Sequence, residues 1–416
     1  MKKTITIALA SFMLVACGGG GDKKVDQSPK TQKENKNTQP NPTTPSTDNQ
    51  VKKDGTSIST TIPSNLGAVY NSTNFNRYTS VKTPNGGSIH IVAQDKITNE
   101  QIIRCRNILK HYLTDFKGSM YGSDKSAIAN NMAKNGAILA LLNGQDDGSN
   151  PLSTKVTGQP LYQNEIQVEG GAWYMAQNYE HRDAAYEEIL HLVHDKGIGV
   201  DGAGGSIGAA PEYQAKIREA QQNALTNNLW AIGTEASKIT EWRNENSLSQ
   251  EYLASVVDSY YGLWGAYTQS GSNGMWGMYV GKTREDTKTD DPMGYALMGQ
   301  FFHPYITYNA QISASLNGNF SLKFDSLKPY TNHSRYLKDV TLLGSNNNSV
   351  SVNELDNIIT GNSGINTVIF SGNSSEYDMS KSSDGTAIII DNLGRDGKNK
   401  LYSIEKLQFN DKTMDL

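Results

Sequence analysis

The stretch that decides the fold reads Tyr186-Glu187-Glu188-Ile189-Leu190-His191-Leu192-Val193-His194-Asp195. Its apolar residues have helical spacing and are interrupted by carboxylates and imidazoles, so we predict a partly buried helix. Residues three and four positions apart share a helix face. Glu187 and Glu188 therefore both reach toward His191. Carboxylate oxygens and imidazole nitrogens gathered on one face are common metal ligands.

This spacing matches the helical H-E-x-x-H zinc motif, except that Glu187 stands where the first histidine would be. A carboxylate binds zinc at about 2.0–2.2 Å, so the replacement is chemically permissible. It makes the site more anionic, which weakens the Lewis acidity of the metal. A structural interpretation stays open, because a lone E-E-x-x-H is common by chance. The acidic residues would then form a solvated helix face, with His191 as a satisfied core residue.

The surrounding pattern predicts an α+β fold. Thr98 and Gln101 have the spacing of a capping box at the start of a helix. We predict strands over residues 88–93, 137–142 and 165–168, and helices from 98 and over 125–134, 186–197, 211–229 and 249–264. A sheet that precedes the key helix, with a mostly helical second half, is compatible with many α+β domains.

Two later segments strengthen the metal interpretation. Glu251-Tyr252-Leu253-Ala254 opens a helix that runs on to Tyr260-Tyr261-Gly262, and Asp291-Pro292-Met293-Gly294-Tyr295 follows. Together with the Glu187 helix, these segments resemble the gluzincin-type metallopeptidases. That family has an H-E-x-x-H helix, a helix beginning Glu-Tyr-Phe-Ala, and then Asp-Pro-x-x-Tyr. The resemblance spans about residues 88–304, is specific only in these three segments, and implies a zincin-like mixed sheet with helices.

The resemblance implies a role for each matching residue. His191 corresponds to the second histidine ligand, Glu251 to the downstream glutamate ligand, and Glu188 to the general base. Glu187 takes the place of the first ligand. The resemblance therefore implies Zn²⁺ held by Glu187, His191 and Glu251, and a peptide or protein as substrate.

Further residues are candidates around this site. His194 and Asp195 are alternate metal ligands, and Asp195 or Asp258 would otherwise orient the imidazole through its second nitrogen. Tyr260 and Tyr261 are candidates for stabilising an oxyanion, as tyrosines do in related peptidases.

The N-terminus predicts export. A basic start precedes an apolar stretch over residues 5–15, which is too short to span a bilayer as a mature helix. The closing Leu14-Val15-Ala16-Cys17 resembles the lipobox of bacterial lipoprotein signal peptides. It implies cleavage before Cys17, lipidation of that thiol, and anchoring at the outer membrane or cell surface of a Gram-negative bacterium. An ordinary secretory signal is the alternative.

Composition divides the chain into four parts. We predict a signal peptide over residues 1–16, a disordered polar tether over 17–65, a domain over 66–335 that the metallopeptidase resemblance implies is zincin-like, and a separate β domain over 336–416. With Cys17 lipidated, Cys105 has no intramolecular partner for a disulfide. A net charge of -4 gives no reason to expect a nucleic-acid partner.

The last part changes to short β segments separated by Asn, Ser and Gly. Residues 355–372 and 404–413 resemble the end of an RTX repeat domain, whose G-G-x-G-x-D-x-U-x turns bind calcium. Asn362 and Asn366 stand where Gly and Asp are expected, and the loss of that carboxylate removes a calcium ligand. We expect a small all-β domain with at most one weak Ca²⁺ site; a generic β-sandwich is the alternative.

The leading hypothesis is a surface lipoprotein with zinc-dependent peptidase activity. The alternative is an inactive zincin-like scaffold that acts in binding or adhesion. A third hypothesis is a carbohydrate-binding or glycosidase-like protein, since carboxylate pairs are plentiful, although the sequence places no pair at glycosidase spacing.

Overall fold

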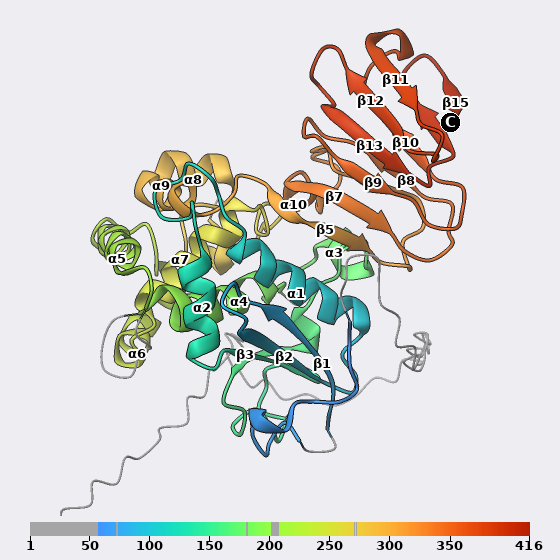
Figure 1. Cartoon of the computed structure of the whole chain (residues 1–416). Coiled ribbons are helices and arrows are strands. Elements are labelled where there is room, and N and C mark those ends of the chain that lie inside the picture. The colour runs from blue at the N-terminus through green and yellow to red at the C-terminus, as the bar shows by residue number, and fades with distance from the viewer. Residues whose placement is uncertain (1–56, 72–73, 180–181, 201–207, 270, 272) are drawn as a thin grey trace, which may run out of the picture.

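The computed structural model describes residues 57–71, 74–179, 182–200, 208–269, 271 and 273–416 (Figure 1). The predicted signal peptide, Cys17 and most of the predicted tether lie outside these residues. Among the helices of this described part, none combines the length and apolarity needed to cross a membrane.

The first half of the chain contains a four-stranded sheet. Its order is β1 (Phe75–Lys82), β2 (Ser88–Gln94), β3 (Ile138–Leu142), β4 (Gln159–Tyr162). β1 is antiparallel to β2, and β2, β3 and β4 are parallel. The predicted strands over 88–93 and 137–142 are confirmed, and the sheet is mixed as the fold class requires.

The predicted strand over 165–168 is wrong, because the strand lies earlier, in β4. A single 3-10 turn, η2 (Gln163–Glu165), follows β4 directly. The Glu165 carboxylate accepts a hydrogen bond from the Tyr162 backbone N–H at 3.3 Å and so favours the turn. Of the two apolar residues in this alternating stretch, only Ile166 is buried in the core. The alternation of apolar and polar residues therefore does not correspond to the two faces of a strand.

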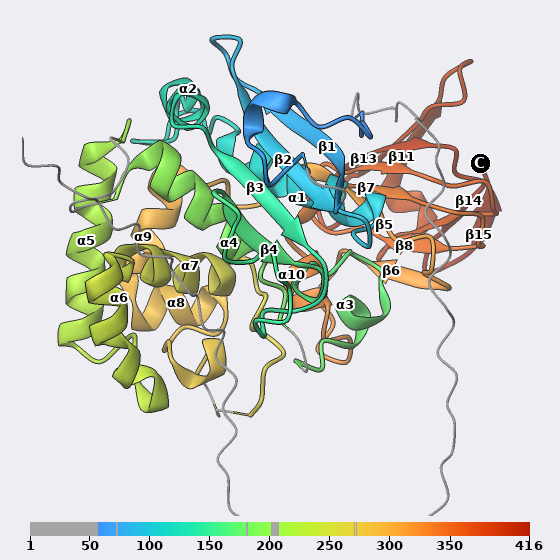
Figure 2. The ribbon, with the colours of Figure 1, turned by 90° about the horizontal axis from the view of Figure 1, so that it is seen from below.

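Three helices pack against this sheet: α1 (Asn99–Leu113), α2 (Ser126–Lys134) and α4 (Ala185–Val193) (Figure 2). The predicted capping box is confirmed, since the Gln101 backbone N–H donates to Thr98 and the Thr98 N–H donates to the Gln101 side chain. α4 is buried along its whole length and contacts β3 and β4 on one side and α1 on another.

The middle of the chain is helical, as predicted, and forms a separate layer (Figures 1 and 2). It contains α5 (Pro211–Thr226), α6 (Ile239–Glu245), α7 (Leu248–Tyr260), α8 (Arg284–Asp290) and α9 (Pro292–Phe301). α7 packs on α4, α5 and α9. The segment of α7 that faces α4 therefore lies beside the predicted site.

The last part forms two sheets between which the chain alternates. One sheet has the order β11-β12-β13-β9-β7-β5 and the other β15-β14-β10-β8-β6. The strands are β5 (Ile306–Ile312), β6 (Asn319–Ser321), β7 (Leu337–Leu342), β8 (Ser349–Ser351), β9 (Ile358–Thr360), β10 (Thr367–Ile369), β11 (Tyr377–Lys381), β12 (Ala387–Asp391), β13 (Lys398–Tyr402), β14 (Lys406–Gln408) and β15 (Thr413–Asp415). In the first sheet, β5, β7, β9 and β13 pair in parallel in that order. In the second sheet, β6, β8, β10 and β14 do the same. The result is a two-sheet coil that begins with β5 and β6, upstream of Tyr336.

Asparagine side chains link successive turns of this coil. The amide of Asn353 donates to the carbonyls of Arg335 and Leu337 at 3.1 and 3.0 Å. Asn348, Asn357 and Asn362 likewise donate to carbonyls of earlier turns. Neutral amides therefore bridge backbone carbonyls inside the turns.

Candidate metal centre

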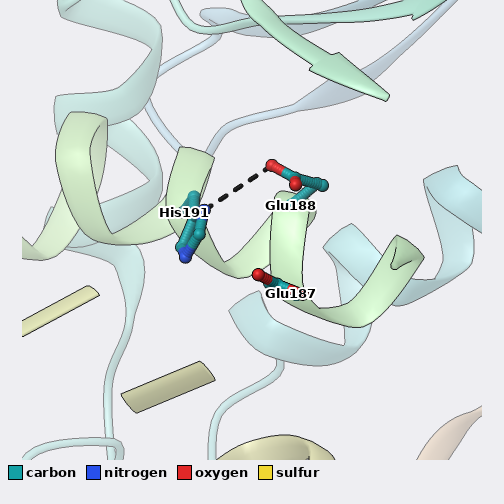
Figure 3. Close-up of side chains that lie close together, drawn as sticks. All are labelled: Glu187, Glu188 and His191. Atoms are coloured by element: carbon teal, nitrogen blue, oxygen red, sulfur yellow. Dashed lines mark ion pairs between the residues drawn. The ribbon is translucent and has the colours of Figure 1, made fainter. Parts of the chain in front are cut away.

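Helix α4 gathers three side chains that can hold a metal ion. One ligand atom each from Glu187, Glu188 and His191 lies within 4.8 Å of the others (Figure 3). Their side chains come from one helix at spacings of three and four residues, as the sequence predicts. All three are buried, with exposed fractions of 5%, 6% and 4%. Buried carboxylates are costly unless they are paired or bind a cation.

Helix α7 adds a fourth group. The Oε1 atom of Glu251 lies 4.0 Å from Nε2 of His191, and Oε2 of Glu188 lies 3.5 Å from Nδ1 of the same ring. The two ring nitrogens therefore face two carboxylates from different helices. His191 Nε2 is buried and has no hydrogen-bond partner. A buried nitrogen that faces an acidic oxygen beyond hydrogen-bond distance leaves room for a shared cation between them.

Arg182, just before α4, supplies positive charge to this group. Its Nη1 donates to Glu187, its Nη2 lies 3.4 Å from Glu188, and its Nε lies 3.7 Å from Glu165. The side chain of Gln159, in β4, donates to Glu188 Oε2 at 2.7 Å. Sequence reasoning missed Arg182 and Gln159 as partners of the α4 glutamates, and Glu165 as a further partner of Arg182, because these contacts join separate elements. The only sequence signal was the proximity of Arg182 to the motif.

The pKa values of the cluster reflect an excess of buried negative charge. Burial lowers the pKa of His191, but the carboxylates of Glu251 and Glu188 outweigh burial and raise it to about 9. Burial together with Glu187 and Glu188 raises the pKa of Glu251 to about 7. Burial also raises the pKa of Glu165 to about 7. Such shifts are common at functional sites.

Asp258 lies at the edge of the cluster. Burial and the charge of Glu187 hold the pKa of its carboxyl well above the ordinary value. Trp264 Nε1 donates to its Oδ2 at 3.4 Å, and Oδ1 is buried without a partner. Among the described residues, the charged groups that act on it most strongly are Glu187 and Arg182, not the His191 ring.

The structure does not bring the alternate ligands into the cluster. His194 Nε2 lies 2.6 Å from the Gln214 side chain, and Asp195 forms an ion pair with Lys196 at 2.7 Å. Both residues belong to a π-helical turn, η3 (His194–Ile198), that follows α4. A wider turn changes the face on which each residue lies, so spacing counted along an α-helix no longer applies.

The two candidate tyrosines lie on another side of α7. The Tyr261 hydroxyl donates to the His303 carbonyl at 2.7 Å and contacts His111 Nε2 at 3.0 Å. The Tyr260 ring packs under the Arg284 guanidinium, 3.7 Å from its centroid.

Asp291 has a structural role. Its carboxylate accepts hydrogen bonds from Tyr252 at 2.6 Å, Tyr279 at 2.9 Å and the Gly294 backbone N–H at 3.1 Å. It thereby caps α9 and fixes that helix to α7.

Comparisons with models of protein families, with curated proteins and with solved structures found no match for this chain. The chain is an α+β protein with a buried Glu187–Glu188–His191 group that could hold a metal ion.

Proposed function

We propose that this chain is an exported lipoprotein whose α4–α7 site binds a zinc ion and hydrolyses peptide bonds. The observation that carries the proposal is the position of His191 Nε2, which is buried, lacks a partner and faces Glu251 at 4.0 Å. An imidazole and carboxylates that converge from two helices are a donor set suited to zinc.

The residues fit a divalent cation. Glu187, His191 and Glu251 would hold the ion, and Arg182 alone does not balance the glutamates around it. The raised pKa values of Glu251 and Glu165 fit this imbalance. When bound, zinc would supply Lewis-acid polarisation of a substrate carbonyl. The protein's part is to present these donors in a dry, fixed environment.

Glu188 is suited to accept a proton from an attacking water. Burial raises the pKa of its carboxyl, but contact with His191 and Arg182 outweighs burial and leaves it below the ordinary value. The group is therefore ionised at neutral pH. The Gln159 amide holds Oε2 in place at 2.7 Å, whereas Oε1 has only the longer contact with Arg182 Nη2 at 3.4 Å, so Oε1 is the oxygen better placed to take a proton.

One observation favours a second function, an inactive scaffold that serves in binding or adhesion. Glu187, the residue in the place of the first histidine, already has a cationic partner in Arg182. A chain that had lost its metal would retain this pair as a purely structural contact.

Metal analysis of the purified protein tests the proposal. We expect one zinc per chain in the natural protein and in His194→Asn, whose side chain lies outside the cluster. His191→Ala should lose the zinc, since it removes the imidazole ligand. Full zinc content in His191→Ala would overturn the ligand set. Zinc without turnover on any peptide would favour the inactive scaffold.

Lipidation needs its own test. Mass spectrometry of the mature N-terminus should find an acylated Cys17, and Cys17→Ser should release the chain from membranes. A mature chain that begins elsewhere would indicate an ordinary secretory signal.

A further inference from the structure

We infer that Arg182 is an internal competitor of the metal ion: a cation of the chain that occupies the site's glutamates and must leave them when metal binds. This inference rests on the proposed metal site and concerns its regulation. Metal binding would then replace the Arg182 guanidinium with the metal ion beside Glu187 and Glu188.

The contacts of Arg182 overlap with the metal donors. Its guanidinium donates to Glu187 and lies 3.4 Å from Glu188. Those two glutamates are the acidic members of the group whose ligand atoms lie within 4.8 Å. Two nitrogens of one guanidinium thus contact one oxygen of each carboxylate, and these carboxylates are also the acidic groups that would face a metal ion. Two cations at these oxygens would repel each other.

An aromatic ring also lies against the guanidinium. The Trp276 ring centroid lies 5.6 Å from the Arg182 guanidinium carbon and 4.8 Å from the Trp264 ring. Met275 and Trp276 have φ angles of 44° and 54°, a left-handed conformation that side-chain-bearing residues rarely adopt. Strain of this kind persists only where surrounding contacts fix it, and it is concentrated at functional sites. Here it places an aromatic face against the cation.

Arg182 adjoins a small cavity and an unused hydrogen-bond acceptor. Arg182 lines a cavity of about 10 Å³ together with Gln177, Asp183 and aromatic side chains. Gln177 is 5% exposed, and its Oε1 has no hydrogen-bond partner. The cavity has room for about one water molecule, so a displaced guanidinium would enter it only if the lining side chains repacked. Gln177 Oε1 would then be available as an acceptor, which would offset part of the cost of leaving Glu187.

The competition has a consequence in each state. Without metal, Arg182 adds to the protonated His191 in offsetting the charge of the buried glutamates. With metal, the dication takes over that role. The affinity measured for zinc is therefore reduced by the free energy needed to displace Arg182.

Zinc affinity, measured on the full chain by competition with a chromophoric chelator, tests this inference. Arg182→Met keeps much of the side-chain volume but removes the charge, so it should bind zinc at least about tenfold more tightly than the natural protein. Arg182→Lys, which presents one ammonium instead of a fork, should fall between the two. Lys196→Met is the control: it removes one positive charge next to the cluster helix but outside the cluster, and should change affinity less than about twofold.

The outcomes separate the two claims. Equal or weaker zinc binding by Arg182→Met, in a protein that binds zinc, would overturn the competition and leave the metal site standing. An absence of zinc binding in both proteins would overturn the proposed function itself. Should Arg182→Met fail to fold, affinity unchanged in Arg182→Lys would overturn the inference, and tighter binding would support it.

Discussion

Nε2 of His191 in α4 and Oε1 of Glu251 in α7 lie 4.0 Å apart, although the two residues are distant in the sequence. Each is buried, and α4 and α7 pack directly against each other. The relationship is a property of helix packing, and it is what turns a local motif into a candidate site with donors from two elements.

Glu251→Gln tests this relationship. The substitution keeps the shape of the side chain and removes its charge, so zinc binding should weaken by more than about 10-fold. In the metal-free protein the pKa of His191 should fall from its value of about 9, because Glu251 is the carboxylate that raises it most. Chelator competition and an NMR titration of the imidazole measure the two effects. The control is Glu241→Gln, an exposed glutamate of α6; an unchanged His191 pKa in Glu251→Gln would contradict the pairing.

Glu188→Gln separates binding from chemistry. It preserves size and hydrogen bonding but cannot accept a proton, so the variant should retain zinc and lose about 10²–10⁴-fold in peptidase turnover. Exposed Glu219→Gln is the matched control and should be as active as the natural protein. Turnover that survives in Glu188→Gln would exclude this residue as the base.

His333 should make the fold sensitive to acid. Burial lowers its pKa to about 4, although its Nδ1 lies 2.8 Å from the Tyr261 carbonyl. Because the unfolded state binds a proton at higher pH, near 6.5, stability falls as pH drops through the window between 6.5 and 4. The loss from this group at pH 5 is about 2 kcal/mol. Urea unfolding at pH 7 and pH 5 should show a smaller acid loss in His333→Gln; an identical loss would assign the sensitivity to other groups.

The C-terminal coil should depend little on calcium. Its turns are bridged by asparagine amides, which donate to carbonyls without any ion. We expect the same melting temperature in chelator and in millimolar calcium, measured by circular dichroism on the whole chain. Asn353→Asp places an oxygen against the Arg335 and Leu337 carbonyls and should cost about 1–3 kcal/mol. Asn347→Asp is the control, because Asn347 is exposed and its Oδ1 accepts from the Ile365 backbone N–H, as a carboxylate oxygen also would. A large stabilisation by calcium would contradict this account.

Much of the site was predictable from local spacing, and the rest was not. Helical periodicity placed Glu187, Glu188 and His191 on one helix, since that geometry is fixed by the backbone. Arg182 and Glu165 joined the cluster through packing between separate elements, which no spacing rule records.

Two local patterns were misleading for identifiable reasons. His194 continues the spacing of His191, but the π-helical turn gives it a different neighbour, Gln214. The alternation at residues 165–168 imitates a strand, yet η2 opens it with a turn and only Ile166 is buried. In the first case a wider, π-helical turn changed the neighbours of His194, and in the second a tight 3-10 turn replaced the expected strand.

The two sheets of the coil both end in antiparallel strands. β15 reverses direction on β14, and the hairpin of β11 and β12 reverses on β13. If the coil ended on β13 and β14, the free edges of these parallel strands would expose unpaired backbone N–H and C=O groups. A strand of a second molecule would be able to pair with them as the strands inside the coil pair. The outer strands here instead carry charged residues such as Lys381 and Asp415, which resist pairing with another chain. Reversal and charge together disfavour the addition of a second coil at this end of the two sheets.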